Sequence, residues 1–133
     1  MKLDALLRAH EFMKIERPPE LWEADVEDVA VIRLMGEMIA FGLRYGTELS
    51  DLTLNASNVV VEEASEHIPA GEFVALTIRG ARDEVPEIVW WPGSGSTFDR
   101  FSDLEGAADA AGAVYAYSRW IDEGSITVFL RRA

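Results

Sequence analysis

One glutamate on an apolar helix is the residue of this chain best placed to do chemistry. Glu37 stands in the stretch GEMIAFGLRYG, residues 36–46, one helical turn before Phe41. A carboxylate held on such a surface could act as a general base. The alternative is structural: Arg33, Glu37 and Arg44 share one stripe of the helix, and a solvated ion pair would account for the glutamate. We predict that Phe41, beside that stripe, fills a pocket with apolar surface.

Two other segments carry groups that could hold an ion. His67 follows acidic residues of a predicted turn, which would allow a metal site, but a turn beside a solvated strand also explains them (Glu62, Glu63, Glu66). Residues 93–97, GSGST, could cradle a phosphate with backbone N–H groups. No lysine follows at P-loop spacing and Asp99 is close, so a flexible connector is the alternative. We expect no metal site.

Two adjacent tryptophans are the candidates for a protein interface. Trp90 and Trp91 end a predicted strand, directly before Pro92 and Gly93. Neighbouring side chains of a strand point to opposite faces, so one indole should enter the core. The other, if exposed, would be an anchor of the kind enriched at protein contacts.

Composition limits the class of protein. The chain has 133 residues, which points to a single domain, and it has no cysteine. Its 24 acidic and 12 basic residues give a net charge of −12, which repels nucleic acid, slows the approach of ATP and favours a basic protein partner. Without an apolar run of bilayer length or a signal-peptide core, the sequence predicts a cytoplasmic protein that binds no membrane.

The periodicity of the chain predicts an α+β fold with one mostly antiparallel or mixed sheet and a helical layer on one face. Residues 1–24 would form an N-terminal helix (2–14) and a connector with Pro18 and Pro19. Asp25 would cap a helix that runs to Tyr45 and stops at Gly46. Strands are predicted at 57–64, 72–80, 87–91, 113–120 and 125–132, the last two joined by a tight turn at 122–124, with a loop at 93–102 and a helix at 104–112.

Two segments in this order are similar to motifs of one family. Residues 37–46 are similar to an N-box, typically Glu-Leu-x-x-Asn-Ala-x-(Arg/Lys)-(His/Tyr)-(Gly/Ala/Ser). Residues 110–117 and 122–130 are similar to a closing helix, glycine and hairpin whose last strand carries Gly-Thr-x-Phe. Together they resemble the GHKL ATPase fold of histidine-kinase catalytic domains and anti-sigma-factor kinases. The resemblance covers residues 25–132, which would form a GHKL-like α+β sandwich.

The resemblance implies roles for the N-box positions. Glu37 would act as or near the general base. Phe41 stands where the family has the asparagine that helps to hold Mg²⁺ on the phosphates, and a phenyl ring cannot coordinate a metal.

The adenine-reading motif of the family, Asp-x-Gly-x-Gly, is also altered. Gly80 occupies the position of the aspartate, and Arg82 and Glu84 occupy those of the two glycines. Asp83, the nearest carboxylate, is three residues out of register. The phosphate lid is reduced at best to residues 93–96. ATP and Mg²⁺ would be cofactors only if these losses were compensated.

These departures favour a non-catalytic regulatory or adaptor domain that acts through a protein partner or a homodimer. One alternative is a divergent ATP-binding kinase of the anti-sigma-factor type, with Glu37 as base. Another is a histidine phosphotransfer protein: residues 9–12, AHEF, are similar to the H-box of histidine kinases around His10, but the expected proline is missing and Lys14 stands nearby. The last is an unrelated α+β domain.

Overall fold

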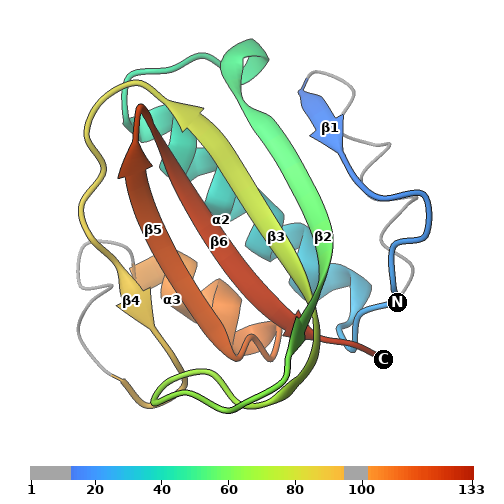
Figure 1. Cartoon of the computed structure of the whole chain (residues 1–133). Coiled ribbons are helices and arrows are strands. Elements are labelled where there is room, and N and C mark those ends of the chain that lie inside the picture. The colour runs from blue at the N-terminus through green and yellow to red at the C-terminus, as the bar shows by residue number, and fades with distance from the viewer. Residues whose placement is uncertain (1–12, 95–101) are drawn as a thin grey trace.

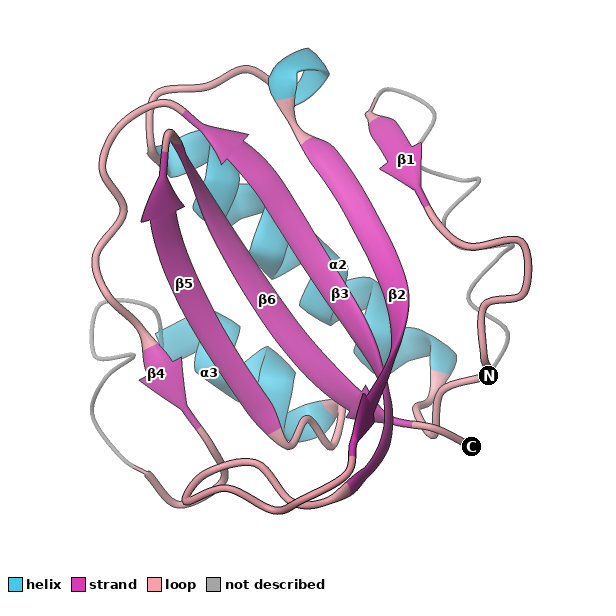
Figure 2. Ribbon diagram, viewed as in Figure 1, coloured by secondary structure: helices cyan, strands magenta, loops and turns pink. Residues whose placement is uncertain are grey.

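The computed structural model describes residues 13–94 and 102–133, which form one sheet with two α-helices packed on one of its faces (Figures 1 and 2). The sheet has six strands in the order β1-β2-β3-β6-β5-β4. The elements are β1 (Lys14–Glu16), α2 (Asp28–Arg44), a 3-10 turn (Leu49–Asp51), β2 (Thr53–Val61), β3 (Gly71–Ala81), β4 (Val89–Trp90), α3 (Ser102–Ala110), β5 (Tyr115–Ile121) and β6 (Glu123–Arg131).

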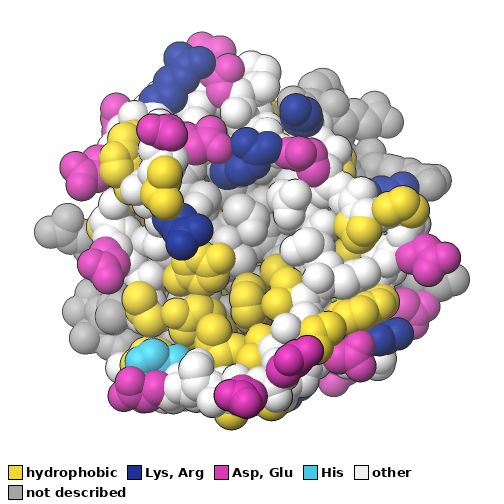
Figure 3. All heavy atoms as spheres, in the orientation of Figure 1, with side chains coloured by type: hydrophobic (Ala, Val, Ile, Leu, Met, Phe, Trp, Pro, Cys, Tyr) yellow, Lys and Arg dark blue, Asp and Glu magenta, His cyan; other side chains and the backbone are white. Residues whose placement is uncertain are grey.

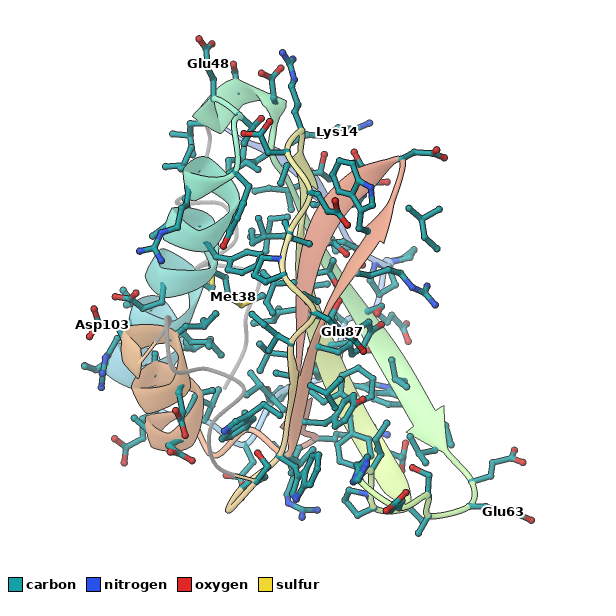
Figure 4. All side chains as sticks on the ribbon, turned by 90° about the vertical axis from the view of Figure 1, so that its left-hand side faces the viewer. Lys14, Met38, Glu48, Glu63, Glu87 and Asp103 are labelled. Atoms are coloured by element: carbon teal, nitrogen blue, oxygen red, sulfur yellow. The ribbon has the colours of Figure 1, made fainter. Side chains whose placement is uncertain are left out.

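The predicted α+β class is confirmed. β1 pairs with β2 in parallel, whereas the other neighbouring strands are antiparallel, so the sheet is mixed. Both helices lie on the same side of the sheet, as the edge-on view of Figure 4 shows. Among the helices of the described residues, none combines the length and the apolar character that a bilayer crossing requires.

Strand alternation divides β3 between two environments. Val74, Leu76 and Ile78 point toward the helices and join the main core. Phe73 and Ala75 point to the opposite, open face, where they form a second cluster with Val114 and Phe129. This is the division that the period-two pattern of the strand predicts.

Helix α2 packs one broad apolar face on the sheet, with Met38 between helix and strands in Figure 4. A glycine lets the backbones approach: a Cβ at Gly42 would stand 2.9 Å from a methyl of Leu52 and 3.3 Å from one of Ile78. The helix ends at Arg44, and Gly46 has a positive φ of 78°, as the sequence predicts for a helix stop.

Several predicted boundaries are wrong. Most of the predicted helix 2–14 lies outside the described residues, but its last residue belongs to strand β1. Asp25 does not cap α2; Glu27 holds the N-cap position, without a side-chain capping hydrogen bond. β2 begins at Thr53 and not at residue 57, and β4 has only two residues, because only Val89 and Trp90 pair with β5.

Candidate functional site

Residues 37–46 and residues 80–84, the two segments compared above with the N-box and with the adenine-reading motif, meet where the end of α2 adjoins the end of β3. The carbonyl of Tyr45 accepts hydrogen bonds from the backbone N–H groups of Arg82 (3.1 Å) and Asp83 (2.9 Å). The Asp83 carboxylate lies directly beside Gly46, since a Cβ there would stand 2.4 Å from its Oδ2. Asp83 is therefore held at the C-terminal end of α2.

Phe41 is buried, with 3% of its surface exposed. It belongs to the main core, and its ring centroid lies 5.2 Å from that of Tyr45, the residue that follows α2. The place that the resemblance gives to a metal-binding asparagine is thus filled by packed apolar surface.

Glu37 is half-buried on α2, and among the described residues it makes no hydrogen bond or ion pair. The predicted ion pair with Arg33 is wrong. The guanidinium of Arg33 extends instead over α3, where a Cβ at Gly106 would stand 3.1 Å from its Nη2. The guanidinium therefore lies near α3, a neighbour that helical spacing alone does not reveal.

Gly80, the position that the resemblance gives to the adenine-reading aspartate, has no room for a side chain. Its φ is +118°, and the β3–β6 register shifts between Arg79 and Ala81, which marks a bulge. A Cβ at Gly80 would stand 2.4 Å from the carbonyl oxygen of Asp51. No side chain fits at this position without moving the 3-10 turn, because the atom in the way belongs to the backbone.

The described surface includes open clefts of about 350–360 Å³ that carboxylates border. The cleft beside the end of α2 is lined by Tyr45, Val85 and Pro86 together with Glu84 and Glu87. Negative groups at a cleft oppose the binding of a polyphosphate. Arg119 contributes a positive charge to the neighbouring cleft along β5.

The two tryptophans occupy different environments. Trp90 is in the core, with 1% of its surface exposed, and so it is not open to a partner in this structure. Trp91 is half-buried, and its ring stacks on His67, with the centroids 3.8 Å apart and the planes 11° from parallel. The strand pleat separates the two indoles, and the loop before β3 supplies the second environment.

His67 contacts an aromatic ring and not a set of carboxylates. Its Nε2 lies 3.9 Å from Glu66, whose side chain is exposed. Within residues 13–94 and 102–133, no three His, Asp or Glu side chains converge as metal ligands. His10, Asp99 and residues 95–97 of the predicted phosphate cradle lie outside the described part of the chain.

One arginine and two glutamates form a cluster on the open face that was not predicted. Arg79 of β3 donates hydrogen bonds to Glu123 of β6 (3.0 Å) and to Glu16 of β1. These bonds, with Glu123 contributing most, raise the pKa of the arginine above its ordinary value, so it stays charged. The bond between Arg79 and Glu16 holds the short strand β1 against the sheet. Alternation along β3 puts Arg79 on the open face, but its partners come from distant strands.

The other half of the open face is apolar. Figure 3 shows hydrophobic side chains gathered over the lower part of this face, with acidic side chains around them. Phe73 and Phe129 are buried there beneath half-buried neighbours, and the ring centroids of Tyr115 and Tyr117 lie 5.9 Å and 6.4 Å from that of Phe129. The helices cover the opposite face, so this aromatic cluster lies on the side of the sheet away from them.

The chain matches no protein-family model and no curated protein. The site must therefore be interpreted from its own geometry.

Proposed function

We propose that this chain is a non-catalytic regulatory or adaptor domain, built on a GHKL-like scaffold, that works through contacts with proteins in the cytoplasm. The order of its elements supports the scaffold: α2 precedes β2 and β3, and α3 precedes the closing hairpin of β5 and β6. The composition, with no cysteine and a charge of −12, favours the location.

The main support for the proposal is the packing at the two positions where the resemblance expects groups that bind a nucleotide. Phe41 is core packing where the family pattern has a metal-binding amide. Gly80 has no room for the adenine-reading carboxylate. An asparagine at position 41 would replace buried apolar packing, and a side chain at position 80 would require the backbone at Asp51 to move, so both positions are built into the packing of the chain.

A partner surface is available on the open face of the sheet. The aromatic cluster around Phe129 offers apolar area, and half-buried Trp91 lies at the end of β4. Acidic side chains surround that area in Figure 3. Aromatic groups inside a polar rim are typical of protein interfaces. The charge favours a partner segment that combines apolar residues with lysine or arginine.

Thermal melting with Mg²⁺ and ATP tests the absence of nucleotide binding. A ligand at 100 times its dissociation constant stabilises the folded state by about 2.7 kcal/mol, which raises the melting temperature of a domain of this size by roughly 5–15 °C. We expect no rise with millimolar ATP and Mg²⁺ beyond that caused by Mg²⁺ alone. A saturable rise that requires the nucleotide would overturn the proposal.

A further inference from the structure

The outer side of α2 is unusually apolar for an exposed helix surface. Val29, Ile32 and Leu43 are 78%, 50% and 41% exposed, and Gly36 and Ala40 between them are also exposed. The spacing of these five residues places them on one stripe, opposite the face that packs on the sheet. Single exposed apolar residues are ordinary, but a stripe along a whole helix marks an interaction surface.

The stripe is symmetric about Gly36. Val29 and Leu43 lie seven residues on either side of it, and Ile32 and Ala40 lie four residues on either side. Two copies of α2 packed antiparallel around a two-fold axis at Gly36 would set Val29 of each copy against Leu43 of the other, and Ile32 against Ala40. A two-fold interface requires a self-complementary surface of this kind.

Gly36 packs against no other element of the described chain. Among the described residues, a Cβ there would meet nothing within 4 Å, and its φ is not in the left-handed region. Glycine is a poor residue for the middle of a helix, so the fold alone would favour alanine. At the centre of a helix pair, however, the missing side chain lets the second backbone approach closely.

The charges beside the stripe fit the same arrangement. Arg33 and Glu37 lie on one flank of it, and they form no ion pair with each other. A two-fold axis at Gly36 places the same flank of both helices on the same side of the interface, so the two flanks lie next to each other. The levels of Arg33 and of the second copy's Glu37 then differ by about 3 Å along the axis, which is within reach of an ion pair.

We propose that the chain forms a two-fold dimer through antiparallel packing of α2 against α2 of a second copy. The 17-residue helix is about 25 Å long, and a contact confined to it buries about 1,000 Å² in total, at the lower limit for a specific interface. The dimer should therefore be weak, with a dissociation constant of about 1–100 µM. This inference goes beyond the proposed function, since it needs neither the partner surface on the sheet nor the loss of nucleotide binding.

Sedimentation velocity of the full chain without nucleotide tests the dimer, at protein concentrations from about 1 µM to about 1 mM. We expect the sedimentation coefficient to rise with concentration. Gly36→Leu should increase the dissociation constant at least about tenfold while the melting temperature, measured at about 1 µM, stays equal or rises, because leucine is the better helix former. Ile121→Ser is the matched control, since Ile121 is 62% exposed on a hairpin away from the stripe; it should leave the dissociation constant unchanged.

The charge pair gives a second readout. Arg33→Glu and Glu37→Arg should each weaken the dimer, and the double variant should recover most of the affinity, because the exchanged charges face each other again. A chain that stays monomeric at about 1 mM, or a dimer that Gly36→Leu leaves intact, would overturn the proposal. Neither result bears on nucleotide binding, so this failure is separate from a failure of the proposed function.

Discussion

Replacing Phe41 by asparagine, the residue that the resemblance implies at this position, tests whether the position belongs to the core. Phe41 is 3% exposed and contacts the ring of Tyr45. Loss of a buried phenyl ring costs about 3–5 kcal/mol, and a buried amide without partners adds about 1–3 kcal/mol. Because asparagine keeps part of the side-chain volume, we expect Phe41→Asn to lower the free energy of unfolding by about 3–5 kcal/mol.

Urea unfolding monitored by tryptophan fluorescence measures this loss, because Trp90 is buried in the same core as Phe41. Ala40→Asn is the control: the incoming residue is the same, but position 40 is exposed on the same helix. It should cost less than about 0.7 kcal/mol, the difference in helix propensity, at protein concentrations of about 1 µM. Equal losses of stability in the two variants would show that Phe41 is not a core residue and that its ring does not fill this position.

Five further substitutions follow from the structure. Gly80→Ala should destabilise by at least about 2 kcal/mol in urea unfolding, because of its positive φ and the clash with the Asp51 carbonyl, whereas Gly36→Ala should stabilise by about 0.5–1 kcal/mol. Trp90→Ala should cost about 3–5 kcal/mol and Trp91→Ala about 1 kcal/mol, the value of its stack, by the same measurement; equal losses would contradict the assignment of one indole to the core. Burial raises the pKa of the Tyr115 phenol, so the stability that depends on its neutral form is complete below the ordinary tyrosine pKa and is lost as the pH rises through the folded-state value. Tyr115→Phe should therefore lose less stability than the wild type above about pH 10, and equal losses would show that Tyr115 does not contribute.

Local patterns were enough to predict the central elements. The helical period and the glycine at its end place α2 close to its observed bounds, with Gly46 as the stop. Alternation predicts β3 and its two faces. The closing hairpin turns tightly at Asp122, whose φ is +64°, where the sequence predicts a turn. These features depend on neighbouring residues, so the sequence alone contains them.

The elements that were missed depend on contacts between distant residues. β1 has only three residues, and its place comes from pairing with β2 and from the bond between Glu16 and Arg79. The connector before α2 is held by Asn58, whose side chain bonds the backbone of Glu20 and Trp22. The periodicity of the sequence does not predict such contacts.

In the candidate site, too, some features follow from the local sequence and others depend on contacts between distant residues. Phe41 was predicted to fill a pocket beside the stripe of Glu37, and it is buried. The closure of Gly80 by the carbonyl of Asp51 was not, because it depends on how the 3-10 turn passes over the bulge in β3. Likewise, Arg33 was expected to pair with Glu37, and only the position of α3 shows where its side chain goes.

The most direct test of the central claim is a nuclear magnetic resonance titration of the isotope-labelled chain with ATP and Mg²⁺, read at individual backbone amides. We expect no saturable shifts at Glu37, Phe41 or Gly80 at millimolar nucleotide, apart from those that Mg²⁺ alone produces. Saturable shifts that require ATP and cluster at the end of α2 and the bulge of β3 would contradict it, because they would show a nucleotide bound where the structure has packed side chains and backbone.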